Sequence, residues 1–482
     1  MNYKVKEILG KIRNSNTYEI LRHSRNYLSA DLSVKAIGFI SIPIFTRLLT
    51  EEEYGIMSVF YAYVPIVLVL LSLNCYNSVS RYYYENKNDF QEFLSTNIIL
   101  LVSIFLSTSS IYFLFYKKIS LFLKLPEPLP LFLIFVSFFN VIYSIYLQKL
   151  YPQKKSREIA ITSISYGYTT FLVAIIITLL LNEERYLGRV LASLIVGFIF
   201  SFFFLYKLGI NYRISLDKKY IKYIILYSLP LIPYSLSEQI LSQFDRIMIN
   251  ASIGAKAAGL YSIGYNIGII TLLFSTALLA SFTPDFFKLM ATKDNAKIDR
   301  MIAKIFSTLL IFSFVLILFG KNILYLLSDP KFYPGSSVIA PVVVGYIFYA
   351  MFNYCSIYII YSKKTIYLSI VTLVSGICNI FLNYYYIPKY GYIAAAYTTI
   401  VSYMLMFLLT WGTVKFLLKL RMTPLSKILK PAFIMFFFMA VYTFLNKFDI
   451  NILFDFIIKI LIILLLALVL FYREIKVISN YI

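Results

Sequence analysis

The stretch that decides the fold is residues 244–265, FDRIMINASIGAKAAGLYSIGY, which has an earlier echo at residues 45–61, FTRLLTEEEYGIMSVFY. In both copies an apolar run ends in Phe-x-Arg, a short polar loop follows, and a new apolar run opens on Gly-x-x-Ser-x-x-Tyr. The matched pairs are Phe45 and Phe244, Arg47 and Arg246, Gly55 and Gly259, Ser58 and Ser262, and Tyr61 and Tyr265. A weak duplication about 200 residues apart, in a hydrophobic chain, is typical of transporters.

Composition places the chain in the membrane. It is 60% hydrophobic with a mean hydropathy of +0.77, and only 14% of its residues are charged. A soluble protein of 482 residues would carry far more polar surface, so the sequence predicts an all-α polytopic membrane protein. The three cysteines have neither metal nor redox spacing, and no GxxxxGK[ST] or HExxH motif is present. We therefore predict no cofactor, no metal and no catalytic residue, and hence no enzyme.

Apolar runs long enough to cross lipid number fourteen. They lie at residues 27–49, 54–78, 91–115, 129–148, 159–181, 187–206, 223–250, 259–287, 303–327, 337–361, 365–387, 391–414, 431–446 and 452–471. With the N-terminus inside, and with residues near the span ends counted with the adjacent loop, the cytoplasmic side holds 31 basic residues and the external side holds 11. This asymmetry predicts that both termini are cytoplasmic. The net charge of +22 is then a collar facing anionic lipid and not a nucleic-acid site.

The repeats begin at the first and seventh spans, and an even offset gives both copies the same orientation in the membrane. The sequence therefore predicts two six-helix lobes plus two extra C-terminal helices. The expected divisions are a basic N-terminal segment at 1–26, an N-lobe at 27–206, a cytoplasmic linker at 207–222, a C-lobe at 223–414, and spans thirteen and fourteen with the C-terminus at 415–482. Gly264 and Gly268 form a GxxxG pattern, for which we predict close helix packing.

Charged side chains inside spans are costly and require a reason. In the first span Asp31 and Lys35 are four residues apart and hence on one helical face. The pair either neutralises itself so that the span can insert, or lines an internal cavity, and the two interpretations are compatible. Lys35→Ala tests them.

The seventh span carries a polar stripe. Ser235, Glu238, Ser242 and Asp245 follow a 3-4-3 spacing along one face. The preceding prolines, Pro230 and Pro233, are expected to break or kink the helix. Glu238 lies near mid-membrane with no basic residue within a turn, so we predict that it binds a coupling ion, H⁺ or Na⁺. Asp245, Ser235 and Ser242 are the other residues that we predict to take part in ion coupling. The alternative is a carboxylate that pairs with a cation from another helix.

Further cations lie near the ends of spans. Arg246, next to Asp245, and Arg47 are expected near the outer interface, where a snorkelling role is the simpler interpretation for Arg246. Arg81 ends the second span on the cytoplasmic side, where it either anchors the helix or guards the mouth of a cavity. We expect Lys35, Arg47, Arg81 and Arg246, with Asp31, to be the candidate substrate-binding residues.

Two stretches resemble a known family. Residues 26–60, NYLSADLSVKAIGFISIPIFTRLLTEEEYGIMSVF, and residues 229–265, LPLIPYSLSEQILSQFDRIMINASIGAKAAGLYSIGY, resemble the signatures of polysaccharide flippases, the Wzx-like proteins of bacterial surface-polysaccharide assembly. The wider superfamily includes lipid II flippases and multidrug and toxin exporters. The arginine cluster that lipid II flippases carry early in the first helix is absent here, which argues against that branch.

The resemblance implies alternating access and an undecaprenyl-diphosphate-linked oligosaccharide, such as an O-antigen or capsule repeat unit, as the substrate. It also implies a multi-pass location in the bacterial cytoplasmic membrane, and it leaves association with the polysaccharide polymerase machinery open. Two alternatives remain. A multidrug exporter would share the fold, whereas an integral-membrane polymerase or glycosyltransferase would need longer external loops than this chain has.

Overall fold

The fold is described from a computed structural model that covers residues 16–209, 217–445 and 452–479, and these are helical without β-strands. Within these ranges fourteen helices are long and apolar enough to cross a membrane. The predicted all-α polytopic class and the number of spans are thus confirmed. Of the predicted N-terminal segment, residues 1–15 lie outside the described residues, and the chain from Asn16 onward belongs to the first helix.

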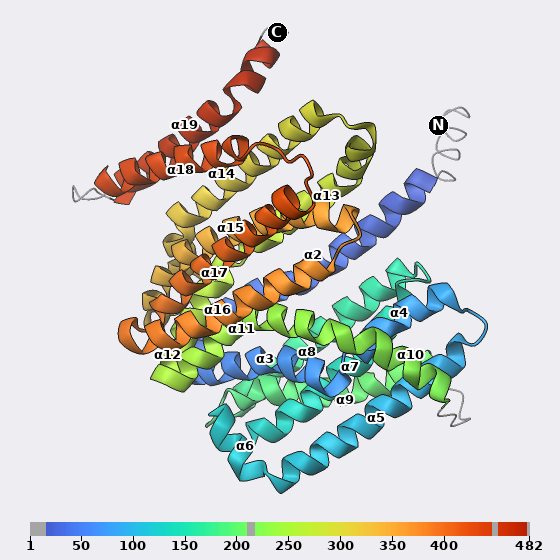
Figure 1. Ribbon diagram of the computed structural model, residues 1–482. Coiled ribbons are helices and arrows are strands. Elements are labelled where there is room, and N and C mark those ends of the chain that lie inside the picture. The colour runs from blue at the N-terminus through green and yellow to red at the C-terminus, as the bar shows by residue number, and fades with distance from the viewer. Residues whose placement is uncertain (1–15, 210–216, 446–451, 480–482) are drawn as a thin grey trace, which may run out of the picture. The chain divides into compact units, whose positions relative to one another are not determined.

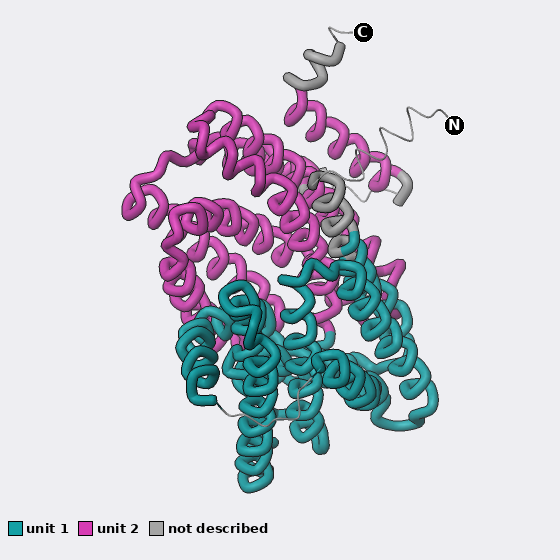
Figure 2. Tube along the Cα trace, turned by 90° about the vertical axis from the view of Figure 1, so that its right-hand side faces the viewer, with its two compact units in different colours: residues 1–259 teal, residues 260–482 magenta. Residues whose placement is uncertain are grey.

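The chain forms two compact units, residues 1–259 and 260–482 (Figure 2). The elements of the first unit are α2 (Asn16–Leu48), α3 (Glu51–Ser72), α4 (Cys75–Glu85), α5 (Phe90–Leu114), α6 (Tyr116–Leu123), α7 (Leu129–Leu150), α8 (Ser156–Leu180), α9 (Leu187–Leu208), α10 (Lys218–Ser228), η1 (Leu229–Leu231) and α11 (Ile232–Ile253). In this unit α2 packs on α8, and α3 packs on α7 and α11 (Figure 1).

The start of α3 shows how the local sequence sets an element boundary. The Thr50 side chain accepts a hydrogen bond from the Glu53 backbone N–H at 3.2 Å, and the Glu53 carboxylate accepts one from the Thr50 N–H at 2.9 Å. This capping box satisfies two amides that have no partner within the helix. The acidic loop of the repeat is therefore a helix start signal.

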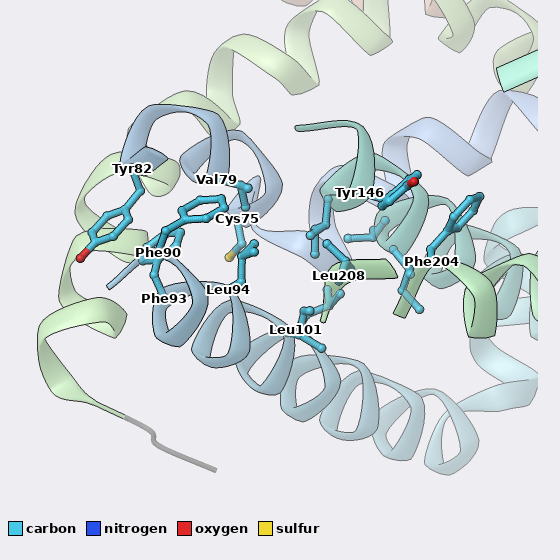
Figure 3. Packing of buried hydrophobic residues seen from close by; sticks show 14 of the residues in the cluster. Cys75, Val79, Tyr82, Phe90, Phe93, Leu94, Leu101, Tyr146, Phe204 and Leu208 are labelled. Atoms are coloured by element: carbon cyan, nitrogen blue, oxygen red, sulfur yellow. The ribbon is translucent and has the colours of Figure 1, made fainter. Parts of the chain in front are cut away.

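Aromatic packing fills the core of the first unit around α4 and α5 (Figure 3). The Tyr82 ring stacks on Phe93 with a centroid separation of 3.9 Å. Tyr220 and Tyr223 of α10 meet Tyr82 edge-on at 5.9 and 5.0 Å. Offset and edge-to-face pairs of this kind add to the stabilisation that burial gives, so α4, α5 and α10 are held together at this end of the unit.

Glycines of the sequence repeat pack on each other in the first unit. A Cβ atom on Gly55 would overlap the Ala255 carbonyl oxygen and lie 3.0 Å from the Gly259 nitrogen. A Cβ atom on Gly259 would overlap the Glu51 carbonyl oxygen and lie 3.0 Å from the Gly55 nitrogen. Equivalent residues thus make reciprocal contacts, as they do across a two-fold axis. The repeat motif is a backbone-to-backbone packing device.

The second unit is built around α15. Its elements are the end of α12 (Ala255–Gly268), α13 (Ile270–Thr292), α14 (Asn295–Leu327), η2 (Pro330–Val338), α15 (Ile339–Tyr361), α16 (Ile366–Tyr390), α17 (Ile393–Gly412), η3 (Thr413–Leu417), α18 (Leu425–Leu445) and α19 (Ile452–Ser479). Helix α15 packs on α13, α14 and α17. On α15, Tyr354 and Tyr358 are buried and meet Phe306 and Phe286 edge-on.

The GxxxG pattern has the predicted packing role. A Cβ atom on Gly264 would overlap the Gly335 carbonyl oxygen, and one on Gly268 would lie 2.5 Å from a Val342 methyl carbon. The absence of side chains lets α12 approach η2 and α15 closely. The compact units divide after Gly259, later than the linker predicted at 207–222, because α11 packs against α3. The division into two six-helix lobes stays a prediction from the repeat.

Candidate functional site

The polar stripe of the seventh span follows a break in the helix. Between α10 and α11, residues Leu229–Leu231 form one 3₁₀ turn, and Pro233 lies at the start of α11. Proline has no N–H to donate, so it leaves carbonyl groups open to other donors. The Ser237 hydroxyl donates to the Pro233 carbonyl at 2.6 Å. The break predicted from Pro230 and Pro233 is thus present.

A second break interrupts the second span. Leu73 and Asn74, between α3 and α4, have φ angles of 47° and 60°, in the left-handed region. Asparagine adopts this conformation more readily than most residues. The Asn74 side-chain N–H donates to the Ser235 hydroxyl at 3.0 Å. The two broken helices therefore meet at their breaks.

Buried amide oxygens gather around the α3–α4 break. The Asn97 side chain on α5 donates to the Cys75 carbonyl at 3.1 Å and to the Ser78 hydroxyl at 3.2 Å. The side-chain oxygens of Asn74 and Asn97 are buried and have no hydrogen-bond partner within the described residues. Oxygens left without donors at the break of a membrane helix are suitable ligands for a cation or a water molecule.

Glu238 lies one turn beyond Ser235 on α11, and its side chain is exposed on the first unit. In the described part of this unit no lysine or arginine forms an ion pair with it. The Ser242 hydroxyl donates to the backbone carbonyl of Glu238, at 3.0 Å, and not to its carboxylate. The Asn74–Ser235 hydrogen bond thus places the start of this polar face of α11 beside the α3–α4 break.

Arg81 lies in a pocket of about 430 Å³ in the first unit. The pocket is lined by Asn77, Ser80, Arg81 and Tyr84 of α4, by Gln148 of α7, by Tyr227 of α10 and by Leu231. Along α4, Arg81 is about 10 Å from the break at Asn74. A guanidinium, two side-chain amides and two tyrosine rings thus border one space.

A carboxylate partly neutralises the Arg81 guanidinium. The Arg81 Nε–H donates to a Glu85 oxygen at 2.5 Å, and the Tyr223 hydroxyl donates to the other Glu85 oxygen at 2.7 Å. The hydrogen bonds from Tyr223 and Arg81 lower the pKa of the Glu85 carboxyl, so it is ionised at neutral pH. Because the Arg81 side chain is 59% exposed, this ion pair contributes little to stability and can open.

Asp31 and Lys35 form the pair that their spacing predicts. The Lys35 Nζ lies 2.6 Å from an Asp31 oxygen, and the side chains are 35% and 56% exposed, respectively. On the same helix, the Asn26 side chain donates to the Ser156 hydroxyl at the start of α8. Asp31 is about 7 Å along α2 from Asn26, so the pair lies in the N-terminal part of the span. Its role in transport stays a prediction.

The remaining predicted cations lie apart from this pair. Arg47 is exposed near the end of α2, about 18 Å along the helix from Lys35, and donates to the Pro43 carbonyl at 2.6 Å. Arg246 is buried and donates to the Gln243 side-chain oxygen at 2.8 Å. Asp245 beside it is also buried. Lys35 and Arg47 therefore lie at different depths along α2.

Sequence reasoning missed several residues of this region. Asn74 and Asn97 mark the helix break, while Gln148 and Tyr227 reach the Arg81 pocket from other helices. The run LNCYN at 73–77 held a signal, since two asparagines interrupt an apolar span. Gln148 and Tyr227 carry no such signal, because their place in the pocket depends on how α7 and α10 pack on α4.

Fourteen apolar helices within the described ranges, with polar breaks at two of them, define a multi-pass membrane protein. Solved structures share this fold. The chain aligns with lipid II flippase MurJ in an inward closed conformation with a TM-score of 0.70 at 18% identity, covering 93% of this chain and 99% of MurJ. An inward-facing multidrug resistance MATE family transporter aligns with a TM-score of 0.64 at 14% identity, covering 81% of this chain and 96% of that one.

Residues 20–290 match the polysaccharide biosynthesis protein family, and the chain belongs to it. The match takes in both signature stretches, so the resemblance seen in the sequence is confirmed. Among its relatives is the "Lsg locus putative protein 1" of Haemophilus influenzae (strain ATCC 51907 / DSM 11121 / KW20 / Rd). It is 27% identical over 327 residues, which are 64% of this chain and 75% of the relative.

Proposed function

We propose that the protein moves undecaprenyl-diphosphate-linked oligosaccharide repeat units across the bacterial cytoplasmic membrane by alternating access. The observation that carries this proposal is the Arg81 pocket, which lies at the end of a broken helix in a chain of the polysaccharide biosynthesis family. A diphosphate and a hydrophilic sugar cannot cross about 30 Å of hydrocarbon unaided, and a polar pocket lowers that barrier.

The chemistry of the pocket suits this substrate. Arginine forms strong, paired hydrogen bonds with phosphate oxygens, and the exposed Arg81–Glu85 pair can give way to a diphosphate. Tyr84 and Tyr227 offer ring faces for a sugar, and Asn77 and Gln148 offer amide donors and acceptors for its hydroxyls. The polyprenyl tail stays in lipid. The protein acts as a carrier and performs no covalent chemistry.

An ion gradient is the energy source that we infer for transport, because the sequence has no GxxxxGK[ST] nucleotide-binding motif. Glu238 is a carboxylate without an ion-pair partner in the described part of the first unit, and it lies next to the meeting point of two broken helices. Ser235 and the buried side-chain oxygen of Asn74 add neutral ligands nearby. We infer that H⁺ or Na⁺ binds in this region, and that its binding and release alternate with those of the substrate.

Arg81 variants test the proposed function. In a strain that lacks its own copy, Arg81→Ala should reduce surface polysaccharide by about 100-fold or more, because a charge-assisted phosphate contact contributes about 3 kcal/mol. Arg81→Lys should keep part of the activity. Lys87→Ala is the matched control, since Lys87 is exposed in the loop that follows α4. Protein abundance in the membrane is measured for every variant.

Two outcomes would contradict the proposal. Wild-type polysaccharide from Arg81→Ala would remove the pocket from the transport path. A multidrug exporter would be favoured instead if the deletion strain made normal polysaccharide but became more sensitive to cationic drugs. The intact gene should then return the drug sensitivity to the wild-type level. Lipid-linked oligosaccharide that accumulates in the inner leaflet of the Arg81→Ala strain would confirm that the block is at translocation.

A further inference from the structure

A second cavity, of about 1030 Å³, lies in the second unit, away from the Arg81 pocket. Three helices border it: the start of α14, the start of α18 and the part of α19 at residues 469–472. Helix α14 packs on both α18 and α19, which also pack on each other (Figure 1). The lining residues are Asp299, Arg300, Ala303, Lys304, Ser307, Lys427, Lys430, Pro431, Ile434, Val469, Leu470, Phe471 and Tyr472.

The charged side of this cavity is basic. Arg300 and Lys304 are one turn apart on α14, and Lys427 and Lys430 are one turn apart on α18. The one acidic residue among the lining residues, Asp299, is buried. Among the described lining residues, four cations therefore border the cavity, and their one carboxylate is not open to solvent.

That carboxylate is already satisfied by nearby cations. The Arg421 guanidinium donates to both Asp299 oxygens, at 2.9 and 3.4 Å, and the Lys427 ammonium donates to one of them at 3.1 Å. A buried carboxylate with two cationic partners has a structural role, since it fixes the loop before α18 against α14. Arg300 and Lys430 form no ion pair within the described residues, so their charges remain available to an anion.

Part of the cavity lining is apolar. Pro431 and Ile434 on α18, with residues 469–471 on α19, continue the wall from the basic side chains. Outward from this wall, Phe433 and Phe437 on α18 and Leu468 on α19 are exposed, as expected for side chains that face lipid. An occupant of this cavity would have an anionic end and an apolar end.

We propose that this cavity binds an anionic phospholipid, with the phosphate between Arg300 and Lys430 and the acyl chains along Ile434 and Phe471. The predicted topology places the α14 and α18 starts and the α19 end at the cytoplasmic interface. Basic pockets between membrane helices on that side bind anionic headgroups. Bulk phospholipid is the occupant we favour, because it is the amphiphilic anion present at the highest concentration around these two helices.

Binding of phosphatidylglycerol to the purified full-length protein in detergent tests this proposal. Native mass spectrometry and the lipid-induced rise in Tm are the two readouts. Arg300→Gln with Lys430→Gln should weaken binding about 30-fold, because each basic residue near an anionic surface contributes about a factor of five. Lys364→Gln with Lys415→Gln is the matched control, since both residues are exposed and the charge lost is the same. The control should bind as the wild type does.

Four results would overturn the proposal. Equal weakening in both double variants would mean that only bulk charge matters. Binding of phosphatidylcholine as tight as that of phosphatidylglycerol would exclude recognition of the headgroup charge. If inorganic pyrophosphate stabilised the protein and the double variant lost this effect, the cavity would be assigned to a free anion. If undecaprenyl phosphate bound more tightly than phosphatidylglycerol and the double variant lost this binding, the cavity would be assigned to the substrate. Lys430→Gln alone repeats the test if the double variant is not monodisperse.

Discussion

At the residue scale, two kinds of charged group occur in the spans of the first unit. Asp31 and Lys35 neutralise each other at 2.6 Å, whereas Glu238 has no cationic partner in the described part of that unit. A neutralised pair lowers the cost of inserting the helix, and this is compatible with a place in the lining of a cavity. An unpaired carboxylate gains nothing structurally and is the stronger candidate for a functional role. The two therefore call for different tests.

We predict that Lys35→Ala abolishes surface polysaccharide while the protein remains in the membrane. Lys35→Arg should retain more activity, because it keeps the charge beside Asp31. Immunoblotting of membranes, together with polysaccharide staining, measures both effects. If Lys35→Ala gives normal polysaccharide, the ion pair serves only to insert the span.

A further residue-scale prediction concerns Gly55. Its missing Cβ makes room for the Ala255 carbonyl oxygen, so Gly55→Ala should destabilise the protein by about 1–3 kcal/mol. Gly38→Ala is the matched control, because a Cβ atom at Gly38 on α2 meets nothing within 4 Å. Thermal unfolding of the two variants in detergent compares them. Equal Tm values would mean that α3 and α12 do not approach as closely as described.

At the scale of elements, the breaks between α3 and α4 and between α10 and α11 matter most. Each interrupts the regular hydrogen bonding of a helix, which is costly in lipid unless other groups satisfy the backbone atoms concerned. The Asn74–Ser235 hydrogen bond joins the two breaks, so movement of one broken helix would be felt by the other. The elements that carry the candidate ion ligands are thus those whose geometry can change.

We predict that Glu238→Gln removes the dependence of translocation on an imposed ion gradient. Glutamine keeps the size and hydrogen bonding of the side chain, but it cannot carry a proton or bind Na⁺ by charge. Proteoliposomes with an imposed pH or sodium gradient measure the effect. Glu183→Gln is the matched control, since it makes the same change at an exposed carboxylate in the loop between α8 and α9. Unchanged gradient dependence in Glu238→Gln would rule out this carboxylate.

At the scale of the whole molecule, the distribution of basic residues predicts the orientation in the membrane. Fourteen spans with both termini inside account for 31 basic residues on one side against 11 on the other. The same orientation places the Arg81 pocket and the basic cavity of the second unit at the cytoplasmic side. Both proposals for ligand binding therefore depend on it.

We predict that reporter fusions after Ile482 are cytoplasmic and that fusions within residues 255–258 are external. An alkaline phosphatase reporter is active only outside and a fluorescent protein reporter only inside, so the two give opposite signals. A cytoplasmic reporter at 255–258 together with an external one at the C-terminus would mean that the charge count gives the wrong orientation.

The sequence by itself determined the class, the fourteen spans, the Pro230–Pro233 break and the Asp31–Lys35 pair. These depend on hydropathy and on spacing along one helix, which are local properties. Only the tertiary structure showed that Asn74 meets Ser235, because the two residues are 161 positions apart. It also decided the Arg81 pocket and the basic cavity. Each needs side chains from several helices, and how helices pack on one another is not encoded in any single span.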